Sequence, residues 1–393
     1  MTIQFVDIYY PNVFKRYSSK FNIFRDLYEN DLAGIEIRGI DFKLAQKIKG
    51  IILNNKEICY NTGKKGDAFS DLLVLGTIGV FKELAKEIIA MGNEDLGIKV
   101  SHTIKNIIGY DKQIIVIGNK KFSLEQAYTI GILNITTDSF SDGGKYINHD
   151  NAVRHGIELL NDGADILDVG GESSRPGSDP ISEEEEIGRV IPVIKEILNK
   201  RPDAIISVDT TKSKVAYEAL SVGAKIVNDI SSFDNDKNVL DVVKKFNAFI
   251  ILMHMKGEPK TMQIDPSYED VVTEVYDYLT AKVEYAKKSG INNIIIDPGI
   301  GFGKRVMDNY ELLKRLNEFK GIGLPILVGL SKKSFLGKAF DLKIDERENH
   351  TLIAETLAIK NGARFIRTHN VKNAVTAVKL NAFLDNPELL QNV

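Results

Sequence analysis

The sequence of 393 residues contains one cysteine, no tryptophan and no long apolar run. Cys59 alone excludes an intrachain disulfide or a cysteine zinc cluster. The longest apolar runs, such as residues 248–253, are far shorter than the roughly 18 residues of a membrane span. Asp7 lies within the apolar start, which argues against a signal peptide. We therefore expect a cytoplasmic protein with no membrane partner.

The chain also lacks a large excess of either charge. It has 51 Lys and Arg against 54 Asp and Glu, for a net charge of -3. Residues 1–124 carry 18 basic and 14 acidic side chains, and residues 125–393 carry 33 and 40. Neither part has the basic excess of a protein that tracks nucleic-acid phosphates. We expect no nucleic-acid partner.

Eight short, mostly apolar runs recur from residue 128 onward and predict strands. Such strands are typical of a parallel sheet that is covered on both faces. Their ends lie about 33 residues apart, which is the length of one βα unit. Segments with helical period and suitable end charges, residues 181–200 and 270–290, lie between them. We predict a (β/α)8 TIM barrel over residues 125–393, with a doubly wound open sheet as the alternative. The runs are residues 128–134, 164–169, 204–209, 224–229, 248–254, 293–298, 325–330 and 363–369.

Residues 1–124 predict a separate, small α/β domain. This region contains no glycine-rich phosphate loop, no paired catalytic carboxylates and no metal-binding cluster, so we expect a structural or dimerising role. The turn at residues 118–121 is expected to begin the connection to the barrel. The predicted strands are residues 4–10, 34–39, 71–77 and 113–118, and the predicted helices are residues 79–91 and 95–108.

Two polar loops directly follow the first two barrel strands. Residues 134–144, NITTDSFSDGG, offer an amide, hydroxyls and carboxylates on a flexible segment suited to closing over a ligand. A solvated loop with Asx turns is the alternative for this segment. In residues 168–178, DVGGESSRPGS, Ser174 and Arg175 are donors that suit a phosphate or a carboxylate. Barrel enzymes collect their active sites at the C-terminal ends of the strands, so we expect both loops there.

Further polar residues end the other barrel strands. Asp209, Asn228 and Asp297 are acceptor-rich and suit a ligand edge with several N–H donors, such as an aminopyrimidinone. A helix cap or a pair with a barrel lysine is the alternative for any one of them. Arg367 and His369 lie two residues apart on the last strand and therefore face the same side. This placement fits the use of the last barrel units for phosphate binding.

The glycine-rich segment DPGIGFGK, residues 297–304, matches neither common nucleotide-binding motif. A dinucleotide fingerprint would need glycine at Lys304, and a Walker loop would need Ser or Thr at Arg305. We therefore expect neither a nicotinamide cofactor nor ATP. His254 and Cys59 are expected to be buried core residues.

Taken together, these segments closely resemble dihydropteroate synthase over residues 125–393. The two polar loops are the most specific part of the resemblance, and residues 207–210, 228–230, 252–262, 297–304, 328–337 and 366–371 support it. The resemblance implies a transferase of folate biosynthesis. The family condenses 6-hydroxymethyl-7,8-dihydropterin diphosphate with p-aminobenzoate to give 7,8-dihydropteroate and pyrophosphate, using Mg²⁺. It also implies a homodimer formed through barrel helices.

The resemblance implies a role for each candidate site residue. Pyrophosphate leaves largely before the amine attacks, and Asp142 stabilises the pterin cation with Asp138 in an ordering role. Lys333 and Arg175 also belong to the catalytic set, and Asn134 coordinates Mg²⁺. Sulfonamides bind in this family at the p-aminobenzoate site. The pterin-binding residues are Asp209, Asn228, Met253, Asp297, Phe302, Gly329 and Lys333; the diphosphate-binding residues are Ser174, Arg175, Arg367 and His369; the p-aminobenzoate-binding residues are Phe140, Pro176 and Ser334.

The sequence departs from the family pattern at four positions. Thr137 stands for a common proline, Ser174 for threonine, Ile300 for a frequent aromatic and Asn370 for a common aspartate. Two alternatives remain open: a pterin-dependent methyltransferase, and a catalytically silent pterin-binding protein. The methyltransferases lack the two long loops and need no diphosphate-binding residues.

Overall fold

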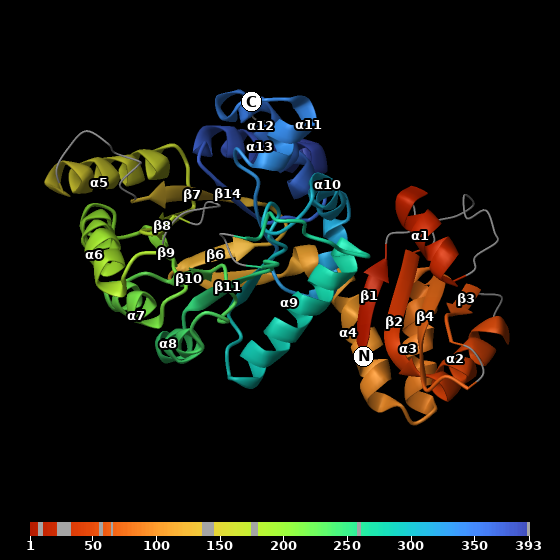
Figure 1. Cartoon of the computed structure of the whole chain (residues 1–393). Coiled ribbons are helices and arrows are strands. Elements are labelled where there is room, and N and C mark those ends of the chain that lie inside the picture. Colours follow the sequence, from red (N-terminus) through yellow and green to blue (C-terminus); the bar gives the residue numbers. More distant parts are fainter. Residues whose placement is uncertain are drawn as a thin grey trace. The chain divides into compact units, whose positions relative to one another are not determined.

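The chain forms two compact units in the computed structural model (Figure 1). The first comprises Met1–Tyr110 and Glu318–Gly323, and the second comprises Asp111–Asn317 and Leu324–Val393. We expected the boundary near residue 124, whereas residues 111–123 belong to the second unit. The structure describes residues 1–6, 11–21, 33–54, 58–63, 66–135, 145–173, 180–257 and 261–390.

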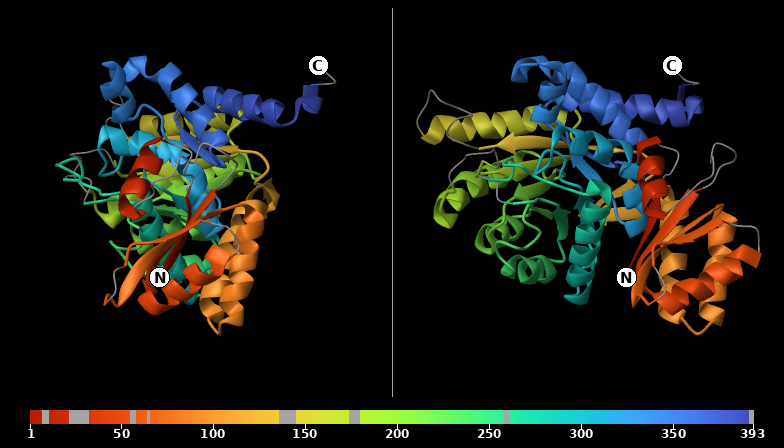
Figure 2. Two further views of the ribbon diagram at one scale, coloured as in Figure 1. Left: turned by 90° about the vertical axis from the view of Figure 1, so that its right-hand side faces the viewer. Right: turned by 45° about the vertical axis from the view of Figure 1, so that its right-hand side comes forward.

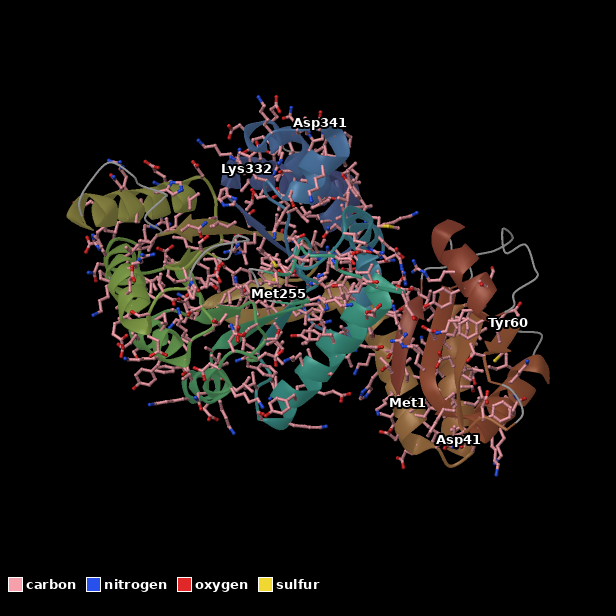
Figure 3. All side chains as sticks on the ribbon, viewed as in Figure 1. Met1, Asp41, Tyr60, Met255, Lys332 and Asp341 are labelled. Carbon is pink, nitrogen blue, oxygen red and sulfur yellow. The ribbon has the colours of Figure 1, made fainter. Side chains whose placement is uncertain are left out.

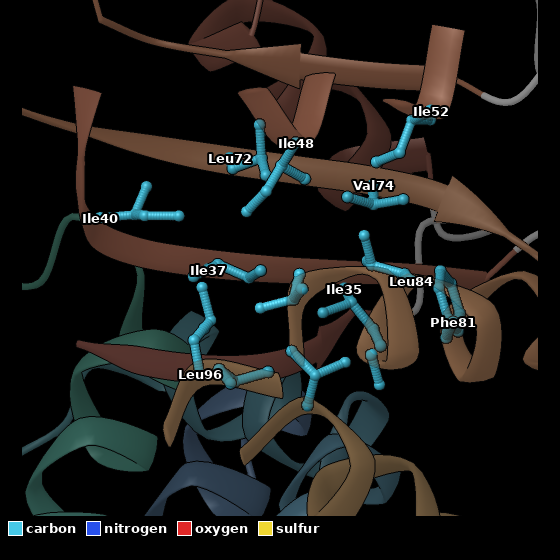
Figure 4. Close-up of a cluster of buried hydrophobic side chains, with 14 of the residues drawn as sticks. Ile35, Ile37, Ile40, Ile48, Ile52, Leu72, Val74, Phe81, Leu84 and Leu96 are labelled. Carbon is cyan, nitrogen blue, oxygen red and sulfur yellow. The ribbon is translucent and has the colours of Figure 1, made fainter. Parts of the chain in front are cut away.

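The first unit contains a four-stranded antiparallel sheet in the order β1-β2-β4-β3. On one face, Ile35 and Ile37 of β2 pack with Ile48 of α2 and Phe81 of α3 in a continuous apolar core (Figure 4). Helices α1 and α2 and strand β3 were not predicted from the sequence. The strands are β1 Thr2–Val6, β2 Ala33–Asp41, β3 Ile58–Asn61 and β4 Phe69–Gly76; the helices are α1 Pro11–Phe21, α2 Phe42–Asn54, α3 Ile78–Ala90 and α4 Glu94–Gly109, followed by the 3₁₀ helix η1 Tyr110–Lys112.

The opposite face of this sheet carries a buried polar network. Side chains alternate along β2, so Glu36 and Arg38 lie on the face opposite the isoleucines. Glu36 accepts hydrogen bonds from Tyr17 at 2.9 Å and Lys20 at 2.7 Å, both on α1, and from Arg38 at 2.7 Å. These partners satisfy a carboxylate that would otherwise be buried at a large cost in free energy.

The second unit is the predicted TIM barrel. Its eight parallel strands are hydrogen-bonded in the order β12-β11-β10-β9-β8-β7-β14-β13. A parallel bridge between Ile296 and Ile326 joins the two edges. This closure excludes the open doubly wound sheet. The strands are β7 Tyr128–Asn134, β8 Ile166–Gly170, β9 Ile205–Asp209, β10 Ile226–Asp229, β11 Phe249–Met253, β12 Ile294–Asp297, β13 Leu327–Gly329 and β14 Phe365–Thr368.

Helices lie outside the barrel strands in the right-hand view of Figure 2. The two helices predicted from end charges begin at strong caps: Ser182 accepts from the Glu185 amide at 3.1 Å, and Asp270 accepts from the Val272 amide at 3.0 Å. The helices are α5 Lys145–Asn161, α6 Glu183–Lys200, α7 Ser213–Ser221, α8 Asn238–Phe246, α9 Val271–Lys288, α10 Val306–Lys314, α11 Ser334–Phe340, α12 Glu348–Lys360 and α13 Val371–Asp385; the 3₁₀ helices are η3 Leu316–Ile322, η4 Ile344–Glu346 and η5 Pro387–Leu390. None of the described helices has the length and apolarity to cross a membrane.

A hairpin of β5 (Ile114–Ile117) and β6 (Lys120–Ser123) precedes the barrel. Its inward residues Ile117 and Phe122 are buried in the apolar cluster formed by the N-terminal halves of the barrel strands. Phe122 packs edge-on against Tyr128 of β7, with ring centroids 4.8 Å apart. This burial explains why residues 111–123 belong to the barrel unit and not to the N-terminal one.

Candidate active site

The C-terminal ends of the barrel strands bring nine predicted site residues to one pocket. Polar residues lie at or next to the ends of the strands. Side chains that are far apart in sequence therefore lie together at the C-terminal end of the barrel. Ile132, Ile230, Ile300 and Ser331 complete the lining. The predicted residues that line the pocket are Asp209, Asn228, Met253, Asp297, Phe302, Gly329, Lys333, Arg367 and His369.

Other predicted residues fall elsewhere. Ser334 is the exposed first residue of α11 and does not line this pocket. Asn134 ends β7 at the same end of the barrel and is partly buried. The two polar loops lie largely outside the described residues, and with them Thr137, Asp138, Phe140, Asp142, Ser174, Arg175 and Pro176.

Arg367 of β14 forms the central ion pairs of the pocket. Its Nε donates to Asp168 Oδ2 at 2.6 Å, and its Nη2 donates to Asp209 Oδ2 at 2.7 Å. Asn228 Nδ2 donates to the same Asp168 oxygen at 2.9 Å. Burial acts to lower the pKa of Arg367, but Asp168 and Asp209 outweigh it and raise that pKa above its usual range. Burial raises the pKa of Asp209 to about 7 against the opposing effect of Arg367.

Lys333 and Asp297 form the other charged side of the pocket. Lys332, labelled in Figure 3, adopts a left-handed turn conformation with φ 56° directly before Lys333. Lys333 Nζ lies 3.9 Å from the centre of the Phe302 ring, a cation–π contact. Burial lowers the pKa of Lys333 to about 8 and raises that of Asp297 above its usual range. Lys333 therefore titrates closer to neutral pH than an exposed lysine does.

The glycines of residues 297–304 allow backbone conformations and close contacts that a side chain would prevent. Gly299 has φ +67°, and a Cβ there would lie 1.9 Å from the carbonyl oxygen of His254. Gly303 has φ +61°, and a Cβ there would lie 2.2 Å from the carbonyl oxygen of Lys256. Only glycine allows this close approach without displacing the strand end. The resulting turn directs Ile300 and Phe302 into the pocket.

Comparisons with known proteins agree with this geometry. A family model described as pterin binding enzyme matches residues 130–369. Dihydropteroate synthase of Escherichia coli K12 is 44% identical over 259 residues, covering 65% of this chain and 91% of that protein. Dihydropteroate synthase of Clostridium beijerinckii is 42% identical, covering 67% of this chain and 97% of that protein. This chain belongs to the dihydropteroate synthase family.

Solved structures of the dihydropteroate synthase family match the barrel. That of Yersinia pestis, in complex with a sulfonamide drug, has a TM-score of 0.65 and 38% identity, covering 70% of this chain and 99% of that one. That of Xanthomonas albilineans with 7,8-dihydropteroate has a TM-score of 0.63 and 34% identity, covering 70% and 99%. The expected fold and the expected transferase of folate biosynthesis are confirmed, which argues against both alternatives left open by the sequence.

The residues present fit the Mg²⁺ that the dihydropteroate synthase family implies. No group of three or more His, Cys, Asp or Glu side chains within the described ranges could hold a metal. Asn134 ends β7 and offers a partly buried amide oxygen at the C-terminal end of the barrel. Mg²⁺ commonly takes one or two protein oxygens and completes its shell with substrate phosphates and water. A single asparagine beside a diphosphate suits that pattern.

Sequence reasoning missed two polar residues of the site. Asp168 is fully buried and accepts hydrogen bonds from Arg367 and Asn228. Ser331 lines the pocket and its Oγ lies 3.0 Å from Nδ1 of His369. The signal for Asp168 was available, because a carboxylate inside a strand that is otherwise apolar needs a buried cationic or donor partner.

Proposed function

We propose that the chain joins the methylene carbon of 6-hydroxymethyl-7,8-dihydropterin diphosphate to the amine of p-aminobenzoate. The observation that carries this proposal is the convergence of Asp209, Asn228 and Asp297 on one pocket with Lys333 and Arg367. The acceptors match the N–H edge of a pterin, and the two cations match its ring carbonyl and its diphosphate. A structure of the Xanthomonas albilineans relative contains 4-aminobenzoic acid, which supports the second substrate.

In this proposal the pterin ring is held by its edge and by its faces. Asp209 and Asp297 accept N–H bonds from the ring, and Asn228 donates and accepts at the same edge. Met253 and Phe302 pack on the ring faces, and Gly329 lines the pocket without a side chain. Lys333 donates to an acceptor of the ring. Charged acceptors give stronger bonds than neutral ones, so the two carboxylates carry most of the recognition.

The reaction breaks the C–O bond to the diphosphate, which leaves with the electron pair. The amine nitrogen of p-aminobenzoate then forms the C–N bond and loses a proton. Arg367 and His369, with Ser174 and Arg175, bind the departing pyrophosphate, and Mg²⁺ held by Asn134 would neutralise part of its charge. As the resemblance implies, we assign Asp142 to stabilising the cationic carbon, Asp138 to ordering its loop, and Phe140, Pro176 and Ser334 to binding p-aminobenzoate. Stabilising charge where it develops is the main catalytic effect in this scheme.

We also propose a cytoplasmic homodimer. Helices α12 and α13 pack together and expose large apolar side chains: Ile353 is 58% exposed, Leu357 52%, Leu380 48% and Leu384 63%. Large apolar side chains exposed on two packed helices favour a protein–protein surface there. The lone, buried thiol of Cys59 suits a reducing compartment.

The test is pyrophosphate release measured with each substrate alone and with both, in the presence of Mg²⁺. We expect release only when both substrates are present. Asp142→Ala should retain pterin binding and lose most turnover. The control is Asp150→Ala, which removes an exposed carboxylate on α5 and should keep full turnover. Sustained release without the amine, or no release with both substrates, would contradict the proposal.

A further inference from the structure

Asp168 connects two parts of the pocket through a single oxygen atom. Its Oδ2 accepts from Asn228 Nδ2 at 2.9 Å and from Arg367 Nε at 2.6 Å. Asn228 belongs to the proposed pterin site and Arg367 to the proposed diphosphate site. Asp168 itself is fully buried and does not line the pocket, so it acts on a ligand only through these two side chains.

The contact at Nε determines which donors of Arg367 face the pocket. A guanidinium carries five N–H donors in a rigid planar fork. With Nε–H bonded to Asp168, Nη2 donates to Asp209, and both Arg367 and Asp209 line the pocket. The Oδ1 atom of Asp168 is buried and has no hydrogen-bond partner within the described part of the chain. The carboxylate is thus committed to Asn228 and Arg367 through Oδ2 alone.

Arg367 already occupies part of the carboxylate that we propose for the pterin. Arg367 Nη2 donates to Asp209 Oδ2 at 2.7 Å, and Asp209 is the carboxylate proposed to receive the pterin N–H edge. A diphosphate offers the Nη groups a more highly charged partner. Its binding would therefore draw those groups from Asp209 and leave the carboxylate available to the ring.

We infer that Asp168 is a positioning residue: it holds Arg367 at Nε as a pivot while the Nη groups exchange Asp209 for the diphosphate, and it orients Asn228 at the same time. This inference rests on the proposed function and adds to it a coupling between the two halves of one substrate. By linkage, such coupling is reciprocal, so each ligand fragment raises the affinity for the other.

The first experiment measures pyrophosphate binding, with Mg²⁺, by calorimetry. Asp168→Asn should weaken binding at least tenfold in the wild-type background and less than threefold in the Arg367→Ala background. A merely structural role would give additive losses in the two backgrounds. The matched control is Asp165→Asn, which removes a partly buried carboxylate at the start of the same strand, where it accepts from the Thr129 amide at 2.8 Å. We expect this control to stay within twofold of wild type.

The outcomes separate this inference from the proposed function. A wild-type chain that binds no pyrophosphate contradicts the diphosphate site itself. If the wild-type chain binds pyrophosphate and Asp168→Asn binds it equally well, the role of Asp168 is overturned and the diphosphate site stands. The same conclusion follows if the losses of affinity from Asp168→Asn and Arg367→Ala are additive. If Asp168→Asn does not fold, the inference is tested on the wild-type chain. Its affinity for 6-hydroxymethyl-7,8-dihydropterin should be at least threefold higher with pyrophosphate than without it. Equal affinity with and without pyrophosphate would then overturn the exchange.

Discussion

Lys304 Nζ lies 2.9 Å from Nδ1 of His254, and both side chains are buried. The three N–H donors of this amine are shared between that ring nitrogen and the carbonyls of Gly299 at 2.8 Å, Phe302 at 3.0 Å and His254 at 3.3 Å. Burial lowers the pKa of His254 to about 2, so the imidazole is neutral and Nδ1 accepts the bond. Lys304 therefore links residues 297–304 to the end of β11 by hydrogen bonds. This segment contributes Asp297 and Phe302 to the pocket.

The first prediction concerns Lys304→Met. The change leaves several buried acceptors without a donor, at about 1–3 kcal/mol for each group that water cannot reach. We expect an unfolding free energy lower by about 2–4 kcal/mol and weaker pterin binding, measured by urea denaturation and calorimetry. Lys338→Met, on the exposed side of α11, is the control and should change stability by less than about 0.5 kcal/mol. Equal losses in the two variants would refute the role of Lys304.

The position of most pocket residues could be predicted from the sequence, because a parallel barrel exposes the polar residue that ends each apolar strand. Asp209 ends β9, Asp297 ends β12, and Arg367 lies one residue before the end of β14, as the spacing indicated. The partners of these residues could not be predicted in the same way. The bond between Asp168 and Arg367 joins residues 199 positions apart, and only the closed sheet brings them together.

Two helices of the N-terminal unit were missed for local reasons. Helix α1 contains Tyr17, Ser18 and Ser19, residues with modest helix propensity. Helix α2 carries Gly50 in its interior, which weakens its periodic signal. Alternation in β2 was visible, but the burial of Glu36 depends on α1 covering that face, a tertiary contact that no local pattern encodes.

The second prediction concerns the pH dependence of pterin binding. Burial raises the pKa of Asp209 to about 7, so below that pH the carboxyl is increasingly protonated and loses its charge-assisted bonds to the ring. The affinity for 6-hydroxymethyl-7,8-dihydropterin should fall by up to about tenfold per pH unit below that value. This ligand has no diphosphate, so titration of the leaving group does not contribute. An affinity that is constant from pH 5.5 to 8, measured by calorimetry, would show that Asp209 does not bind the ring as a carboxylate.

The third prediction concerns assembly. We expect the wild-type chain to elute as a dimer in size-exclusion chromatography with light scattering. The double variant Ile353→Glu and Leu384→Glu places charges in the exposed apolar patch of α12 and α13, and should weaken the dimer at least tenfold in dissociation constant. Met307→Glu, at a 63% exposed position on α10, is the control and should remain dimeric. A dimer that survives the double variant must use another surface.

The fourth prediction concerns Glu355, which is fully buried on α12. Burial raises its pKa to about 8, and neither carboxyl oxygen has a hydrogen-bond partner among the described residues. In the unfolded chain the pKa of glutamate is about 4.3, so between the two values the folded state holds a proton that the unfolded state has lost. The contribution of Glu355 to stability is therefore complete at low pH and falls as the pH rises toward about 8.

Glu355→Gln removes this proton exchange while keeping nearly the same shape. The stability of the variant relative to wild type should rise with pH between 5 and 8, by at most about 1.4 kcal/mol per pH unit. Urea denaturation at pH 5, 6.5 and 8 measures the trend. Glu388→Gln, at an exposed position in η5, should differ from wild type by the same amount at every pH. If Glu355→Gln behaves in the same pH-independent way, then Glu355 is already ionised in the folded barrel and a cation must compensate its charge.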